Sequence, residues 1–390
     1  MNEHKAVPNI RFNGFKDEFK VGKLENFFDI KDGTHSSPQY INSGFPLVTS
    51  KNLTESGLKL ENASYISKSD FDEINKRSKV DVGDILFGMI GTIGTPVMIK
   101  ENNFAIKNVA LIKEFSKPEV LNIWLIYYFQ SPAFDKFIHF RSSGGTQKFL
   151  ALGVIQNMKF KFPLKKEQQK IGNLFAKLDK LLDLQQQKID KLELLKKALL
   201  QKLFPKHDAK IPEFRFKGFE GDWRSCDLGK IAKLYQPKTI TQKQMTSEGY
   251  PVFGANGFIG FYGKKNHSTD QVTISARGEN AGVTSYVFAP VWITGNSMVI
   301  NVDKNADIDK HFLFFDLSLI NLKKFVTGGA QPQLTGETLR RVKIIVTKIK
   351  EQQKIGNFLS KVDQIIELEN KKLQDFQQVK KCLLQNMFVE

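Results

Sequence analysis

A segment of 39 residues occurs twice in the chain, and this duplication limits the possible folds more than any other feature. Residues 166–204 read KEQQKIGNLFAKLDKLLDLQQQKIDKLELLKKALLQKLF, and residues 350–388 read KEQQKIGNFLSKVDQIIELENKKLQDFQQVKKCLLQNMF. The copies are 184 residues apart and match at 18 of 39 positions without a gap. A repeat of this length indicates one framework built twice.

A second, shorter echo precedes each half. Residues 8–15 read PNIRFNGF and residues 212–219 read PEFRFKGF. Between these echoes and the long repeats lie two stretches, about 15–163 and 219–347, that resemble each other only weakly. Similar frames around dissimilar inserts favour a scaffold that presents two different surfaces.

The long repeat has the pattern of a helix whose apolar residues are three and four positions apart, as in a coiled coil. At 1.5 Å per residue, each helix would be roughly 55–60 Å long. We expect the two helices to pair as an antiparallel coiled coil, although each could instead pack only on its own insert. Polar Gln185 and Glu369 would interrupt the seams. The predicted seams are Ile171, Leu174, Leu178, Leu181, Leu192, Leu195 and Leu199 in the first copy, and Ile355, Phe358, Val362, Ile365, Phe376, Val379 and Leu383 in the second.

Each insert reads as short strands followed by a helix. The first has strand-like runs near 45–49 and 84–90 and a helical run at about 118–139. The second has strands near 250–254, 271–276, 283–288 and 297–302 and a helix near 309–325. The predicted fold class is therefore α+β, with two α+β domains, two long helices and a pseudo-twofold internal repeat. The predicted segments are a first domain at 1–163, a first helix at 164–207, a second domain at 208–347 and a second helix at 348–390.

The charge of the chain points to a polyanionic partner. Lys and Arg number 58 against 41 for Asp and Glu, which gives a net charge of +17. Such an excess suits nucleic acid or an anionic membrane surface, although it could also be a solvated lysine-rich surface. No apolar run approaches the ~18 residues that span a bilayer, and the start lacks a signal-peptide core. The two cysteines are far apart in the sequence, and we expect a cytoplasmic protein with no membrane partner.

Loops between the predicted strands carry the candidate DNA contacts. Glycine lets the backbone approach a surface closely, Asn and Gln can bond adenine edges, and Arg or Lys can bond guanine. Any one of these loops could be only a turn, but a Gly-Gly-x-Gln sequence recurs at 144–147 and 328–331. The candidates are Thr34, His35, Lys51, Asn52, Thr92, Thr146, Gln147 and Lys148 in the first domain, and Asn256, Arg277, Asn280, Gln331 and Gln333 in the second.

The sequence shows no motif for catalysis. It lacks a GxxxxGK[ST] phosphate loop, a GxGxxG cofactor loop, an HExxH metal motif and the Asn/Asp-Pro-Pro-aromatic motif of adenine methyltransferases. We therefore expect no catalytic or metal-binding residues. Two alternatives remain: a nuclease or methyltransferase with a cryptic active site, and a coiled-coil scaffold with no DNA role.

The repeated frame resembles that of type I restriction-modification specificity subunits over essentially the whole chain. The motif begins at Pro163 and continues through Glu167 and Gln168 into Leu178-Asp179. It returns at 350–355 and leads into Val362-Asp363, with Thr347 in the place of Pro163. Two segments, 32–35 and 275–280, also resemble parts of the family's target recognition domains.

The resemblance implies a non-catalytic subunit with two target recognition domains, each reading half of an interrupted sequence in double-stranded DNA. The paired helices would set the gap between the halves. Such a subunit joins two modification (methyltransferase) subunits, which methylate adenine, and restriction (motor-nuclease) subunits, which cleave unmodified DNA. The chain itself would hold no cofactor, because S-adenosylmethionine, ATP and Mg belong to the partner subunits.

Overall fold

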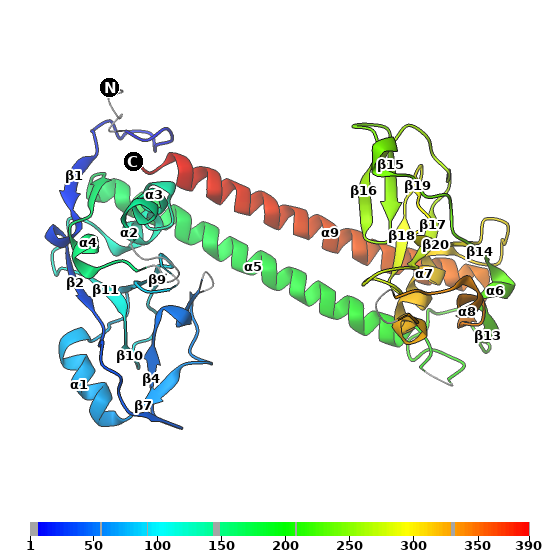
Figure 1. Ribbon diagram of the computed structural model, residues 1–390, viewed down its shortest axis with the longest axis horizontal. Coiled ribbons are helices and arrows are strands. Elements are labelled where there is room, and N and C mark those ends of the chain that lie inside the picture. Colours follow the sequence, from blue (N-terminus) through cyan, green and yellow to red (C-terminus); the bar gives the residue numbers. More distant parts are fainter. Residues whose placement is uncertain are drawn as a thin grey trace. The chain divides into compact units, whose positions relative to one another are not determined.

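The computed structural model describes residues 7–54, 57–91, 93–142, 149–206, 209–328 and 332–389. The chain forms two compact units, the first made of Met1–Gln185 with Lys372–Glu390 and the second of Gln186–Lys371. Each unit contains one α+β domain and part of both long helices, α5 (Lys165–Leu203) and α9 (Ile349–Asn386) (Figure 1). The α+β class and the two long helices predicted from the sequence are confirmed.

The first unit is organised around strand β11 (Val109–Glu114), whose alternate residues face two separate cores. Ala110 and Ile112 belong to a large aromatic core with Trp124, whereas Val109 and Leu111 belong to a smaller aliphatic core. The strand pairs with β2 and β8, and both pairings are antiparallel. Its sheet has the order β2 (Phe28–Asp32), β11, β8 (Ile85–Gly88) and β9 (Val97–Met98).

The remaining elements of the first unit surround this sheet. A second sheet has the order β10 (Ala105–Ile106), β4 (Phe45–Val48), β7 (Ser64–Ile66) and β3 (Tyr40–Ile41). Two ribbons pair β1 (Lys20–Lys23) with β12 (Lys159–Phe162) and β5 (Leu53–Thr54) with β6 (Gly57–Leu58). The helices are α1 (Lys68–Ser78), α2 (Asn122–Tyr128), α3 (Pro132–Arg141) and α4 (Leu152–Gln156).

The single helix predicted at 118–139 is in fact two helices, α2 and α3. The break falls at Ser131, which has extended backbone angles, and Pro132 begins the next helix. Proline has no backbone N–H and a fixed φ, so it suits the first position of a new helix better than the interior of a continuing one.

The second unit also consists of a four-stranded sheet, a smaller sheet, a two-stranded ribbon and short helices. One sheet has the order β14 (Lys233–Tyr235), β20 (Ser297–Asn301), β17 (Gln271–Ser275) and β18 (Thr284–Val287). A smaller sheet has the order β16 (Gly257–Tyr262), β15 (Tyr250–Gly254) and β19 (Trp292–Ile293), and a ribbon pairs β13 (Arg224–Asp227) with β21 (Lys343–Val346). Its helices are α6 (Leu228–Ile231), α7 (Lys310–Leu319) and α8 (Gly336–Arg340).

The long helices pack against each other in both units, and the pairing is antiparallel. In the first unit Lys380 of α9 forms an ion pair with Asp179 of α5 at 2.7 Å. In the second unit Lys188 pairs with Glu369 and Lys196 with Asp363, each at 2.6 Å. Because residue numbers rise along one helix as they fall along the other, the predicted antiparallel arrangement is confirmed (Figure 1).

The predicted seam was only partly right. Leu181 and Leu195 are 46% and 49% exposed, and their counterparts Ile365 and Val379 are equally open. The buried apolar residues of α5 are Ile171, Phe175, Ile189 and Leu203, and of these only Ile171 belongs to the predicted seam. Each helix carries two adjacent apolar stripes with the same three-four spacing, so periodicity alone could not decide which stripe is buried. Gln185 does lie inside the seam, as predicted, and is 6% exposed.

Candidate functional site

The most conserved feature between the two halves of the chain is a buried polar contact at the start of each long helix. In the first unit, Arg11 donates two hydrogen bonds to the carboxylate of Glu167, each 2.8 Å long. Glu167 is completely buried. The hydrogen bond to Glu167 raises the pKa of Arg11. Such a two-pronged ion pair fixes the short N-terminal segment against α5.

The neighbouring Gln168 ties the same helix to the domain. Its side-chain oxygen accepts from the backbone N–H of Leu121 at 2.8 Å, and its Nε2 donates to the carbonyls of Glu119 and Pro163. Gln168 is also fully buried. We call Arg11, Glu167 and Gln168 the first joint.

The second unit contains the same arrangement, the second joint, made of Arg215, Glu351 and Gln352. The two Arg215–Glu351 hydrogen bonds are 2.8 and 2.9 Å long. Gln352 accepts from the backbone of Asp309 and donates to the carbonyls of Asp307 and Thr347. The two joints explain why Glu-Gln and the arginine of the short echo recur together in the sequence.

One substitution separates the joints. Where the first half has Pro163, the second has Thr347, whose hydroxyl donates a 2.5 Å hydrogen bond to Glu351. The second carboxylate therefore has a donor that proline cannot supply. The change from Pro to Thr leaves the turn into the helix intact, because the carbonyl of either residue accepts from the following glutamine.

The loops that differ between the halves carry the candidate DNA contacts. In the first unit, Thr34 and His35 follow the end of β2. The His35 ring lies between two oxygens: its Nε2 is 2.6 Å from Oδ2 of Asp32, and its Nδ1 is 2.8 Å from Oδ1 of Asn108. Thr34 pairs through its backbone with Lys107. The structure thus adds Lys107 and Asn108 to the two predicted residues.

We define the first loop surface as residues 32–37 with Tyr40, Arg77, Lys107 and Asn108. Arg77, from the last turn of α1, donates to Oδ1 of Asp32. Lys107 donates to the hydroxyl of Ser37 at 3.0 Å and contacts that of Tyr40. Sequence reasoning missed Arg77 and Lys107 because neither lies in a glycine-rich turn, which was the signal used.

The two neighbouring candidates Lys51 and Asn52 differ in their exposure to solvent. Lys51 is exposed, but Asn52 is buried and hydrogen-bonded through both the oxygen and the nitrogen of its side chain. Its oxygen accepts from Thr49, and its amide donates to the carbonyl of Lys59 at 3.1 Å. Asn52 therefore stabilises a turn and does not offer its amide to a base. The other candidates of this domain, Thr92, Thr146, Gln147 and Lys148, lie outside the described residues.

In the second unit the structure brings four predicted residues together. Asn280 donates to Oδ1 of Asn256 at 2.9 Å, and Arg277 forms a backbone bridge with Gln333. Gly278, whose φ of 78° favours glycine, donates from its N–H to the carbonyl of Pro332 at 3.1 Å. Gln331 lies outside the described residues.

We define the second loop surface as residues 255–256, 277–280, 327–328 and 332–333. An open pocket of about 360 Å³ adjoins it, lined in part by Glu279, Lys323 and Thr327. Glu279 and Lys323 were not predicted, since the search looked for amides and for lysine or arginine next to glycine. The second surface thus offers amides, a guanidinium group and one carboxylate, and Lys323 adds an ammonium group in the adjoining pocket.

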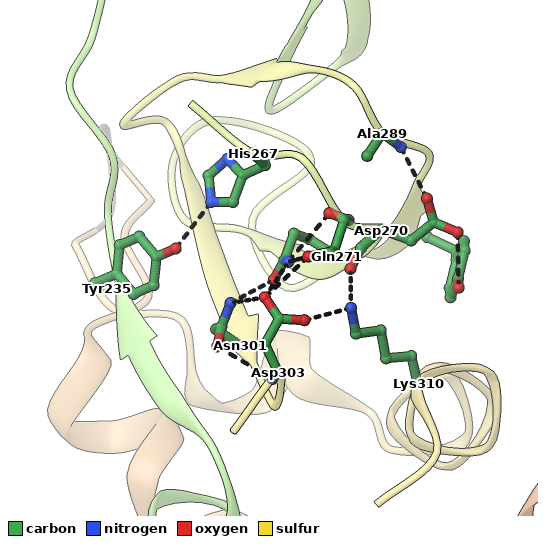
Figure 2. Close-up of polar contacts among 10 residues, drawn as sticks. Tyr235, His267, Asp270, Gln271, Ala289, Asn301, Asp303 and Lys310 are labelled. Carbon is green, nitrogen blue, oxygen red and sulfur yellow. Dashed lines mark hydrogen bonds and ion pairs between the residues drawn. The ribbon is translucent and has the colours of Figure 1, made fainter. Parts of the chain in front are cut away.

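A polar cluster around Asp303 is built into the framework of the second unit (Figure 2). Burial raises the pKa of Asp303, but hydrogen bonds from Lys310, Gln271, Asn301 and Thr269 outweigh this effect and lower the pKa to about 2. A carboxylate held in this way is a poor proton acceptor. The cluster joins β17, β20 and α7 and has the character of a structural network.

His267 at the edge of this cluster is equally occupied. Its Nε2 is 2.8 Å from the hydroxyl of Tyr235 (Figure 2). Its Nδ1 is 2.6 Å from Oδ1 of Asn266. Burial lowers the pKa of His267, which favours the neutral ring. Within the described ranges, no group of three or more His, Cys, Asp or Glu side chains is arranged to hold a metal ion. Over the same ranges, none of the helices is long and apolar enough to cross a membrane.

Comparison with known proteins identifies the family. The type I restriction modification DNA specificity domain matches residues 16–194 and 220–378, which is most of the chain and both halves. A putative type I restriction enzyme MjaX specificity subunit from Methanocaldococcus jannaschii is 23% identical, covering 94% of this chain and 92% of that protein. The EcoprrI specificity subunit from Escherichia coli is 28% identical over 38% of each chain.

Solved structures share the fold. The crystal structure of the S subunit of a type I restriction-modification system from M. genitalium superposes with a TM-score of 0.73 at 18% identity, covering 98% of this chain and 99% of that one. A chain from a structural study of complex assembly and conformational transition of the type I system gives a TM-score of 0.55 at 15% identity, with coverage of 94% and 96%. The chain therefore belongs to the type I restriction-modification DNA specificity family, as a DNA-target recognition subunit and not as an enzyme.

Proposed function

We propose that the chain reads a bipartite sequence in double-stranded DNA, with one half-site bound by each domain. The observation that carries this proposal is the contrast between the joints and the loop surfaces. The joints repeat the same three side chains, whereas the first loop surface groups His35 and Arg77 around a buried carboxylate and the second groups amides around a hairpin. One framework that presents two different sets of donors and acceptors suits two different base sequences.

We further propose that α5 and α9 set the gap between the half-sites. The helices contain 39 and 38 residues, so they are matched in length as two sides of one spacer would be. Phosphate contacts come from the positive charge of the chain, and affinity for DNA should then fall steeply with salt, by about 0.9 in log K per log salt for each phosphate neutralised.

Two copies of one modification subunit are the proposed protein partners, and the restriction subunits join the complex that they form. Leu181 and Leu184 are exposed on α5, and the residues at the same positions of the repeat, Ile365 and Leu368, are exposed on α9. Exposed apolar patches of this kind mark interaction sites. Because the patches occur at equivalent positions, one partner surface would fit both.

The chemistry belongs to these partners in our proposal. S-adenosylmethionine and the adenine-methylating centre are placed on the modification subunits, and ATP and Mg on the restriction subunits. The chain itself would bind no cofactor, and calorimetry of the isolated chain with S-adenosylmethionine should show no stoichiometric binding. A role on chromosomal DNA places the complex in the cytoplasm.

A domain exchange tests the proposed reading of DNA. Residues 15–163 are replaced by the corresponding block of another specificity subunit, and the methylated motif is determined by methylome sequencing of the host. One half of the motif should change, while the other half and the gap stay the same. A change in both halves would mean that the domains read DNA jointly, and an unchanged motif would reject the assignment.

The partner proposal has its own test. Leu184→Lys and Leu368→Lys each place a charge in one patch, and native mass spectrometry then counts the modification subunits bound. Each single variant should lose one copy and the double variant both, with Gln187→Lys, at an exposed position of α5, as the matched control. Two copies retained by the double variant would exclude these patches as the docking site.

A further inference from the structure

Asp32 at the end of β2 organises two exposed side chains from different parts of the first unit. It is only 6% exposed, yet its Oδ2 is 2.6 Å from Nε2 of His35, and its Oδ1 accepts from Arg77. His35 lies three residues later in the chain and Arg77 lies 45 residues later. One buried carboxylate therefore fixes an imidazole and a guanidinium side by side.

The surrounding backbone holds this cluster firmly. Asp32 is paired with Ala110 in the central sheet, so the backbone that carries the carboxylate is held in place by strand pairing. Beyond it, the N–H of Thr34 donates to the carbonyl of Ile106 at 3.0 Å. The His35 ring is held on its other side by Asn108, whose φ of 55° marks a tight turn. The donors are thus ordered before any ligand arrives.

Among the described residues, Asp32 is the one hydrogen-bond partner of Arg77, so most of its donors can turn to a ligand. Its side chain is 63% exposed, and only one of its terminal nitrogens donates to Asp32. A guanidinium group has five N–H donors in a planar fork, which matches the O6 and N7 acceptors of guanine in the major groove. Prior orientation by Asp32 reduces the side-chain entropy that binding would otherwise cost.

The immediate surroundings suit a DNA backbone. Lys107 lies on the same loop surface, where it donates to Ser37 at 3.0 Å and lies 6.0 Å from the centre of the Tyr40 ring. Its ammonium group can take a phosphate while the guanidinium reaches a base. The only carboxylate among the residues of the first loop surface is Asp32, and it is buried beneath its two partners.

We infer that Arg77 is the residue through which the first domain reads a guanine, with Asp32 as its positioning residue. Both ring nitrogens of His35 are engaged, by Asp32 and by Asn108, so His35 supports Asp32 and does not contact a base. This inference deepens the proposed function and rests on it. It assigns a base class to the first half-site: at least one position must be guanine on one strand.

Three variants separate base reading from a phosphate contact. Arg77→Gln replaces a guanine reader by a side chain that suits adenine, Arg77→Lys keeps the charge but loses the planar fork, and Asp32→Asn keeps the shape but loses the charge that orients Arg77. Lys76→Gln is the matched control, since Lys76 precedes Arg77 on α1 and is exposed, with Glu73 as its partner. Each variant is assembled with its modification subunits. The readouts are the methylated motif and the kcat/KM on duplexes altered one base at a time.

With Arg77→Gln, the preference for guanine at one position of the first half-site should fall roughly tenfold to a hundredfold, with adenine now accepted there. Arg77→Lys should keep only part of the preference, because lysine can bond guanine but lacks the planar fork, and Asp32→Asn should weaken the preference at the same position. The second half-site and the gap should stay unchanged, and Lys76→Gln should behave as the wild type.

The inference is overturned if Arg77→Gln lowers activity equally on every duplex while the motif stays the same, because that result would make Arg77 a phosphate contact. If Arg77→Gln fails to fold, as judged by circular dichroism, Arg77→Ala decides: unchanged discrimination at every position overturns the inference, and lost discrimination for guanine at one position supports it. The domain exchange distinguishes a failure of the proposed function from a failure of the guanine assignment. An exchange that moves one half of the motif, with Arg77 variants that leave the motif unchanged, rejects only the guanine assignment.

Discussion

The joints have nearly the same residues in both units, whereas the loop surfaces have different ones, and burial explains this difference. Each joint holds a fully buried Glu-Gln pair beneath a bidentate arginine, with nearly equal distances in the two units. A buried charge whose partner is removed destabilises a fold by several kcal/mol, so the joint tolerates little change. Exposed loop side chains make no such demand. The framework can therefore stay the same while the reading surfaces diverge.

The largest expected effect comes from breaking a joint. Arg11→Ala leaves the carboxylate of Glu167 buried without its partner and should lower the free energy of unfolding of the first unit by about 3–5 kcal/mol. Arg215→Ala should cost about 1–2 kcal/mol less, because Thr347 still donates to Glu351. Urea unfolding followed by peptide-level hydrogen exchange reports each unit separately.

The exposed Arg141 at the end of α3 provides the control, and Arg141→Ala should change stability by less than about 0.5 kcal/mol. Equal losses for Arg11→Ala and Arg215→Ala would show that the Thr347 hydroxyl contributes nothing. If neither variant lost stability, burial of the joints could not explain why their residues are the same in both units.

A smaller expected effect is a difference between the two units in how their stability depends on pH. Burial raises the pKa of Asp316 in the second unit to about 7, and only the backbone N–H of Ile345 opposes it. Between about pH 4 and 7 the unfolded chain loses this proton while the folded chain retains it. The contribution of Asp316 to the stability of the second unit is therefore fully present below about pH 4, and on the order of 4 kcal/mol of it is lost as the pH rises to 7.

Asp316→Asn should flatten this pH dependence without altering the first unit. Asp135→Asn in α3 is the companion variant, since burial also raises the pKa of Asp135 but this side chain lies at an exposed position. The free energy of unfolding of each variant, measured as a function of pH, shows which of the two carboxylates causes the pH dependence. A slope that survives in Asp316→Asn would assign it to other groups.

The smallest change concerns spacing rather than stability. Four residues inserted after Gln185 lengthen α5 by about 6 Å and nearly complete a turn, so the gap in the methylated motif should grow by one or two base pairs of about 3.4 Å each. Two inserted residues would rotate the buried stripe by about 200° and should weaken assembly. An active four-residue variant with an unchanged gap would show that something other than α5 and α9 sets the distance.

The sequence predicted the framework well because the framework is repeated. The helix pair and the two α+β domains follow from duplicated patterns, and the joint residues stand inside the repeated motif itself. The choice between two apolar stripes on α5 did not follow, because only tertiary packing distinguishes Phe175 from Leu174.

The loop surfaces were harder to predict. Turns with Gly, Asn, Thr and Lys between the predicted strands pointed to His35 and Arg277, but also to Asn52, which the fold uses in a turn. Such turns do not point to Arg77, since the contact with Asp32 joins residues from a strand and a distant helix. Contacts between such separate elements leave no local pattern in the sequence.

The most direct test of the account duplicates one domain. Residues 212–347 are replaced by a copy of residues 8–163, so that a copy of Arg11 takes the place of Arg215 in the second joint while both surfaces become the first one. Because the helices pair antiparallel, the two identical domains should read the same half-site in opposite directions. The account predicts that methylome sequencing will find an interrupted palindrome built from the original first half-site. An active complex that still methylates the original asymmetric motif, or one unrelated to the first half-site, would contradict the claim that each domain reads its own half.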